Sequence, residues 1–171
     1  MHPRTALFAH RSALRFVALA AALIGFLFVL SVGQAGAARP ASGVLMGSKP
    51  VPWTGGVARA EVPPGEIPEC AGTTCDRFDL VVDLPRGIWK GKTGGVAISI
   101  GWPNAADNLK LYVYRDGALV AESEAVGASS QSVLIPEAPN GTYRVYAAYD
   151  PSSLNDRVFY NGNAAVQRAA R

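Results

Sequence analysis

The sequence predicts an all-β protein, an antiparallel jelly-roll-like β-sandwich of about seven or eight strands over residues 70–171. From Cys75 onward, apolar and polar residues alternate with period two, as they do in strands that bury one face. Turn residues interrupt this alternation about every ten residues. No stretch of this part keeps the 3.6-residue period of an amphipathic helix, so helix is expected to be nearly absent.

The first predicted strand is FDLVVDL at residues 78–84, where Phe78 and the alternate aliphatic residues face away from Asp79. Two dipeptides typical of hairpin turns follow, Asp116-Gly117 and Asn140-Gly141. The other predicted strands are, in order, residues 95–102, 108–115, 118–124, 132–135, 141–149 and 157–167. Because the strands are short and closely spaced, they favour a sandwich over a sheet covered by helices.

The chain of 171 residues accommodates one folded domain and excludes a large multidomain enzyme. It has 16 Lys and Arg against 13 Asp and Glu, but three arginines lie in the first 37 residues, which contain no acid. The rest of the chain is therefore formally neutral, and nucleic acid is not expected as a partner. Both histidines, His2 and His10, also precede residue 38, which excludes histidine-based catalytic and zinc sites from the body.

Residues 1–37 predict a signal peptide, and hence a secreted protein in an extracellular compartment. Arginines precede an apolar run at residues 16–32, and the small residues Ala35, Gly36 and Ala37 follow, so cleavage is expected after Ala37. The alternative is an uncleaved membrane anchor through residues 16–32, since this run approaches the roughly 20 residues that span a bilayer.

Residues 38–69 are rich in Pro and Gly and show no apolar period, which predicts a linker or a loosely wrapped arm. Trp53 in this arm is expected either to fill a groove of the domain or to be an exposed recognition residue. Cys70 and Cys75 are the only cysteines, and in an exported chain they predict a structural disulfide at the start of the sandwich.

The runs CDRFDLVVDLPRGIWKGKTGGVAISIGWPNAADNLKLYVYRDGALVAES and SVLIPEAPNGTYRVYAAY resemble the bacterial pre-peptidase C-terminal domain. The resemblance covers about Cys70 to Val166. It is carried by a strand that opens with phenylalanine, a D-L-x-L-Y-V-Y-like strand, a D-G turn and a late G-T-Y strand. The matching residues are Phe78, Leu109, Leu111, Tyr112, Val113, Tyr114, Asp116, Gly117, Gly141, Thr142 and Tyr143.

This resemblance implies a non-catalytic sandwich that accompanies secreted peptidases or sialidase-like hydrolases as a folding, attachment or targeting module. In some relatives it implies calcium-assisted binding of collagen or polysaccharide. The family's strand often carries acids where this chain has Asn108 and Lys110.

Asp107, Asn108 and Asp116 are the weak calcium candidates, because calcium takes carboxylate and carbonyl oxygens in irregular geometry. Lys110 opposes such a site, and Asp116 also suits the first position of a type I′ turn. No other cofactor is expected.

An aromatic patch with one cation is predicted where two strands turn their second faces outward; its members are Tyr112, Tyr114, Arg144 and Tyr146. Such a patch suits sugar rings or flat peptide surfaces, whereas the alternative is cross-strand tyrosine pairing without a ligand. Glu122 and Glu124 stand on one strand face at a spacing that glycosidases use, but an exposed strand face lacks the burial that a catalytic acid needs.

The predicted function is a non-catalytic secreted accessory or binding module for extracellular polysaccharide or protein, or for a partner hydrolase. One alternative is a structural spacer or a remnant of a longer secreted peptidase or sialidase-like enzyme. Another is a small hydrolase that uses carboxylates alone. Tyrosines buried beneath residues 38–69 would favour a structural role over a binding role.

Overall fold

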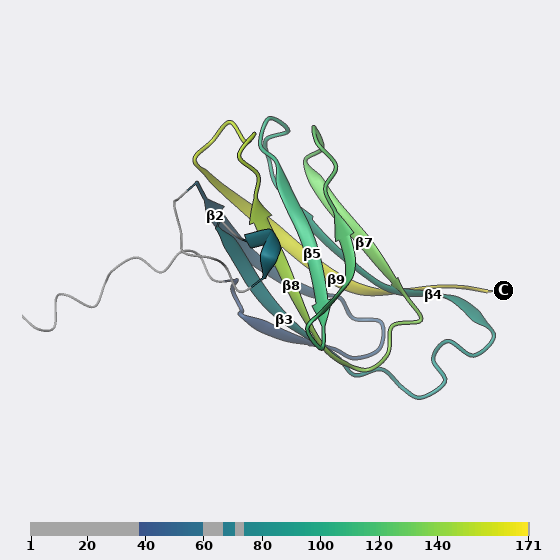
Figure 1. Ribbon diagram of the computed structural model, residues 1–171. Helices are drawn as coiled ribbons and strands as arrows, with labels where there is room; N and C mark the ends of the chain where they lie inside the picture. Colours follow the sequence, from purple (N-terminus) through teal and green to yellow (C-terminus); the bar gives the residue numbers. More distant parts are fainter. Residues whose placement is uncertain (1–37, 60–66, 71–73, 171) are drawn as a thin grey trace, which may run out of the picture. The chain divides into compact units, whose positions relative to one another are not determined.

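The computed structural model describes residues 38–59, 67–70 and 74–170 (Figure 1). The predicted all-β sandwich is confirmed, with two sheets built from the described strands. In chain order the elements are β1 (Ser42–Leu45), β2 (Val51–Ala58), the short 3₁₀ helix η1 (Pro68–Cys70), β3 (Cys75–Val82), β4 (Lys92–Gly101), β5 (Leu109–Arg115), β6 (Ala118–Ser123), β7 (Ser130–Pro136), β8 (Gly141–Tyr149) and β9 (Arg157–Ala170). Within these residues, no helix has the length and apolar character needed to cross a membrane. The predicted signal peptide at 1–37 lies outside the described residues.

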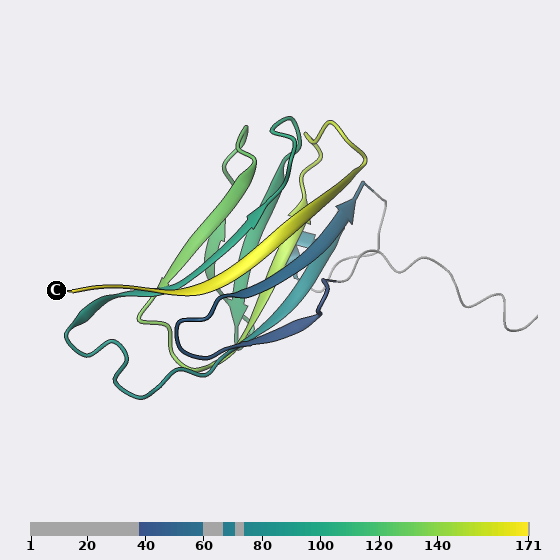
Figure 2. The ribbon, with the colours of Figure 1, turned by 180° about the vertical axis from the view of Figure 1, so that it is seen from behind.

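One sheet has the strand order β1-β3-β8-β5-β6, and the other has the order β2-β9-β4-β7. All pairings are antiparallel except that of β1 with β3, which is parallel. Figure 2 shows the second sheet from its outer side, with the long β9 between β2 and β4. The inward side chains of both sheets form one apolar core, as the period-two pattern predicts.

Trp53 lies in this core and stacks on Phe78, with ring centroids 4.1 Å apart and planes 6° from parallel. The stack is possible because Gly162 faces it from β9: an added Cβ there would lie 2.0 Å from the Trp53 indole. Trp53 is 2% exposed and is therefore a core residue, not a recognition residue.

The predicted arm at residues 38–69 is wrong over its first part, because β1 and β2 belong to the two sheets. The predicted domain start at Cys70 is therefore too late. Sequence periodicity misses β2 because Gly55 and Gly56 interrupt its apolar alternation. The structure needs a glycine at position 55, where an added Cβ would lie 2.1 Å from a carboxylate oxygen of Asp76.

The predicted Asp116-Gly117 turn joins β5 to β6. Both residues have positive φ, 51° for Asp116 and 81° for Gly117, as a type I′ turn requires.

Candidate functional site

The three tyrosines of the predicted aromatic patch do not form a surface. Tyr112 is 3%, Tyr114 8% and Tyr146 2% exposed. Tyr114 and Tyr146 meet edge to face, with centroids 6.0 Å apart and planes at 87°. Arg144 lies between Asp79 and Tyr114 in the strand register and is exposed. The predicted binding patch is thus corrected to a second hydrophobic cluster on the outer face of the first sheet.

The segment around η1 covers this cluster. Ile67 and Cys70 pack on the tyrosines, and the predicted Cys70–Cys75 disulfide is present, with the two Cα atoms 5.7 Å apart. The Tyr114 hydroxyl donates a hydrogen bond to Glu69 at 2.5 Å. Burial and the nearby carboxylate of Glu69 raise the pKa of Tyr114 to about 12. The disulfide therefore holds a cap over one sheet face.

The two glutamates considered for catalysis are exposed and do not form an isolated acid pair. Glu124 accepts a hydrogen bond from the Tyr112 hydroxyl, and its other oxygen lies 3.7 Å from Lys110 Nζ. Burial and the same glutamate raise the pKa of Tyr112. Glu122 is on the edge strand β6 and is exposed to solvent. The geometry gives neither carboxyl the apolar burial that a general acid requires.

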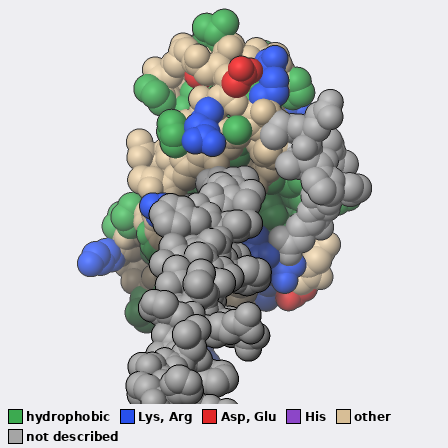
Figure 3. All heavy atoms as spheres, turned by 90° about the vertical axis from the view of Figure 1, so that its left-hand side faces the viewer, with side chains coloured by type: hydrophobic (Ala, Val, Ile, Leu, Met, Phe, Trp, Pro, Cys, Tyr) green, Lys and Arg blue, Asp and Glu red, His purple; other side chains and the backbone are tan. Residues whose placement is uncertain are grey.

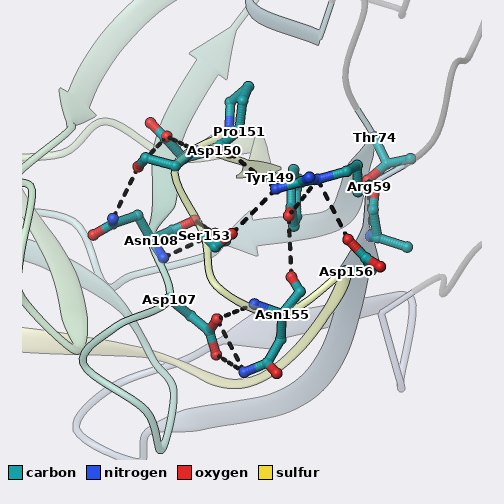
Figure 4. Close-up of polar contacts among 12 residues, drawn as sticks. Arg59, Thr74, Asp107, Asn108, Tyr149, Asp150, Pro151, Ser153, Asn155 and Asp156 are labelled. Atoms are coloured by element: carbon teal, nitrogen blue, oxygen red, sulfur yellow. Dashed lines mark hydrogen bonds and ion pairs between the residues drawn. The ribbon is translucent and has the colours of Figure 1, made fainter.

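Asp107 is buried. Its carboxylate accepts hydrogen bonds from within the sandwich (Figure 4). Its two carboxylate oxygens accept hydrogen bonds from the Asn155 side-chain amide at 2.9 and 3.1 Å, and one also accepts the Asn155 backbone N–H at 2.9 Å. Its carbonyl accepts the Trp102 indole N–H at 2.8 Å. These bonds tie the loop before β5 to the loop before β9.

Asn108 has a similar structural role, because its side chain binds Ser152 at 3.0 Å and the Gly127 N–H at 3.0 Å. Asp116 lies at the opposite end of β5, in the exposed turn after Arg115. The structure therefore does not bring together the three predicted calcium candidates. The described residues contain no group of three or more His, Cys, Asp or Glu side chains arranged to hold a metal ion.

The outer face of the second sheet carries a set of short uncharged polar side chains, which we call the amide-hydroxyl face. It consists of Thr54, Ser99, Ser132, Asn161 and Asn163. The register places them in two neighbouring rows. Asn163 pairs with Ser99, which pairs with Ser132, and Thr54 pairs with Asn161. The first row crosses three strands, β9, β4 and β7, about 10 Å at the usual strand spacing.

On this face Thr54, Ser132 and Asn161 are exposed, and Ser99 and Asn163 are half-buried. Apart from one contact of the Thr54 hydroxyl with the Arg39 carbonyl at 3.5 Å, these side chains make no hydrogen bond to another described residue. Phe159 stands beside them on β9, 65% exposed, with the Arg157 guanidinium 5.9 Å from its ring centroid. Leu134 on β7 is 47% exposed at the other side.

Basic and acidic side chains are mixed on the side of the molecule seen in Figure 3. The red acidic groups visible there lie beside blue basic ones, and the other basic groups are scattered among the residues drawn in colour. This distribution agrees with the near-neutral body expected from the sequence. It gives no electrostatic reason to expect a polyanion as ligand.

No protein-family model matches the chain, and no curated protein matches it either. Among solved structures, it is similar to the pre-peptidase C-terminal domain of a collagenase from Bacillus anthracis. The identity is 10%, the match covers 74% of this chain and 94% of that one, and the TM-score is 0.41. A pre-peptidase C-terminal domain is thus among the structures that this chain resembles, as the sequence resemblance predicts.

The chain is also similar to the periplasmic inhibitor of g-type lysozyme from Aeromonas hydrophila. Here the identity is 12%, the match covers 74% of this chain and 100% of that one, and the TM-score is 0.42.

Sequence reasoning missed the amide-hydroxyl face. The signal was present in NGNAAVQ, where Asn161 and Asn163 occupy alternate positions and so share one strand face. However, the neighbours of β9 are β2 and β4, which lie far away in the chain. Alternation shows which residues share a face, but not which strands are adjacent.

Proposed function

We propose that this protein is a non-catalytic, exported accessory domain that binds neutral extracellular polysaccharide through the amide-hydroxyl face. The observation that carries the proposal is the row of Asn163, Ser99 and Ser132 across the outer face of the second sheet. The second row, Thr54 and Asn161, lies between it and the exposed ring of Phe159. Amides and hydroxyls both donate and accept hydrogen bonds, as sugar hydroxyls do. An exposed aromatic ring offers an apolar surface for the flat face of a sugar.

The non-catalytic part of the proposal is supported by the way the sandwich uses its acids. Asp107 is engaged by Asn155, Glu124 by Tyr112, and Asp79 by Arg77. Each of these carboxylates thus has a structural partner in the protein. The disulfide supports the exported part, because such bonds persist in oxidising compartments.

Direct binding of the purified exported protein to an array of neutral polysaccharides, charged polysaccharides and fibrillar proteins tests this function. We expect saturable binding to at least one neutral polysaccharide, and at least tenfold weaker binding by Phe159→Ala. Parallel arrays with calcium and with a chelator test the calcium expectation separately. Binding confined to charged polymers or to fibrillar proteins would contradict the proposed ligand class.

A structural role is the second candidate, and the burial of the three tyrosines under η1 favours it, because it removes the predicted binding patch. In this role the sandwich acts as a spacer or a folding aid for a partner hydrolase. A folded protein that binds nothing on the array would support the structural role against the binding role.

A further inference from the structure

Asp76 is an ionisable residue at a position that the strand pattern reserves for the core. On β3 it shares the inward face with Phe78, Leu80 and Val82, and it is 1% exposed. A carboxylate at such a position requires partners that replace water. The groups around the Asp76 carboxylate therefore indicate which kind of partner this position binds.

The protein supplies part of what this carboxylate needs. Oδ2 accepts a hydrogen bond from the Tyr160 hydroxyl at 2.9 Å and from the Gly56 N–H at 3.2 Å. Oδ1 is buried and has no partner of full hydrogen-bond geometry in the described part of the chain. No lysine or arginine side chain of the described residues forms an ion pair with Asp76.

The antiparallel bridge between Arg39 and Thr54 sets Ala38 across from Gly55, the residue whose Cα faces the Asp76 carboxylate. Ala38 is 2% exposed within the core, and its backbone N–H is among the groups that lower the pKa of Asp76 against the effect of burial. The next residues fix its position. Arg39 exchanges two backbone hydrogen bonds with Thr54 on β2, at 2.7 and 3.0 Å, and Ala41 accepts one from Asp79 on β3 at 3.0 Å. The chain thus passes from one sheet to the other with Ala38 held between them.

Ala38 is also the residue that follows the cleavage site predicted from the sequence. Hydrolysis of the bond between Ala37 and Ala38 consumes one water, leaving a carboxylate on Ala37 and an ammonium group on Ala38 at neutral pH. We propose that Asp76 is the binding site for this new α-ammonium group, so that removal of residues 1–37 completes the core of the sandwich. The inference rests on the export and cleavage in the proposed function, but not on polysaccharide binding.

The other groups around Asp76 are compatible with this ion pair. The titratable side chain that faces it is Tyr160 from β9, whose pKa is raised by burial and by Asp76, so the phenol stays neutral. β2 contributes Gly55 and Gly56, and β8 contributes Ala147, the register partner of Asp76. In the unprocessed chain, the nitrogen of Ala38 is an uncharged amide, and burial raises the pKa of Asp76 to about 6. Cleavage changes this donor into a cation at the same place.

The test uses the exported wild-type protein. Its intact mass and N-terminal sequence are expected to begin at Ala38, and a first residue other than Ala38 overturns the proposal. Nitrogen-15 NMR then gives the pKa of the α-amino group. An ion pair raises this value at least one unit above the usual value of about 8, whereas burial without a counter-ion lowers it. An unchanged or lowered value overturns the proposal.

A second readout is carbamylation of the α-amine by cyanate. The folded protein is expected to react at least tenfold more slowly than the protein unfolded in guanidinium. Asp76→Asn is expected to lose most of this protection, while the control variant Asp83→Asn, at an exposed position just after the far end of β3, keeps it. If Asp76→Asn does not fold, the pKa of the α-amino group in the wild-type protein is by itself the test of the proposal. Equal rates in folded and unfolded wild type overturn the proposal, and polysaccharide binding by the same sample shows separately whether the proposed function holds.

Discussion

The buried Asp76 carboxyl predicts an inverted pH dependence of stability in a chain whose Ala38 nitrogen is still in a peptide bond. A soluble tag fused ahead of Ala38 produces such a chain. Burial raises the pKa of Asp76 from 3.8 to about 6, a shift of about two units, or about 3 kcal/mol at 1.36 kcal/mol per unit. Because the folded-state pKa lies above the unfolded one, this stability is fully present below pH 3.8 and is lost as pH rises through 6.

The assay is chemical denaturation of the tagged wild type and tagged Asp76→Asn at pH 4 and pH 8. The pH-dependent contributions of the other acids to the unfolding free energy are the same in both proteins and cancel in the difference. One is Asp150, where burial opposes ionisation but hydrogen bonds from Ser152 lower the pKa. The wild type is expected to lose about 2 to 3 kcal/mol relative to the variant between the two pH values.

Removal of the tag, so that Ala38 becomes the first residue, is expected to reduce this loss, because the ammonium group stabilises ionised Asp76. The reasoning would be refuted if the difference in unfolding free energy between tagged wild type and tagged Asp76→Asn were the same at both pH values, within about 0.5 kcal/mol.

Three further outcomes are expected. Gly162→Ala introduces a Cβ 2.0 Å from the stacked indole and should lower the unfolding free energy by about 1–3 kcal/mol or more, whereas Gly101→Ala, with 3.8 Å to its nearest neighbour, should leave it nearly unchanged in urea titrations. Replacing Cys70 and Cys75 together by serine opens a short loop and should cost about 2 kcal/mol in the same assay; an unchanged midpoint would contradict the role of the cap. Absorbance titration of the phenols should show Tyr114 ionising near pH 12, and at lower pH once the disulfide is reduced; a Tyr114 pKa near 10 in the oxidised protein would exclude the buried cluster.

Period-two alternation was enough to predict the strands that bury one face. β3 shows this in FDLVV, where inward and outward residues alternate over its whole second half. The Asp116-Gly117 turn was also predictable, since few residues other than Gly, Asn and Asp accept positive φ at both central positions.

β1 and β2 could not be predicted in the same way. β1 has only four residues, and β2 contains Gly55 and Gly56, whose missing side chains leave room for Asp76 and Phe159. These glycines look like linker residues in the sequence. Glycine is needed at these two positions because they contact strands more than 20 residues away along the chain. Local sequence composition does not reveal such contacts.

The error over the tyrosines has another cause. β5 is buried on both faces, because η1 and the disulfide cover the face that the sequence pattern leaves to solvent. Alternation separates the two faces of a strand, but it does not show that a segment without strand character packs on one of them. The proposed pairing of Asp76 with Ala38 could not be predicted from the sequence either. The group that Ala38 contributes is its backbone nitrogen, and residue types do not show where a backbone group lies.

The most direct test of polysaccharide binding by the amide-hydroxyl face compares two variants with the same added charge. Asn163→Lys places a lysine at the β9 end of the row, beside Ser99, while Thr142→Lys places one on the exposed outer face of the other sheet. Binding to the best neutral polysaccharide is measured for both by calorimetric titration, after matching circular dichroism spectra. The account predicts at least tenfold weaker binding for Asn163→Lys and wild-type binding for Thr142→Lys; equal affinities of the two variants would contradict it.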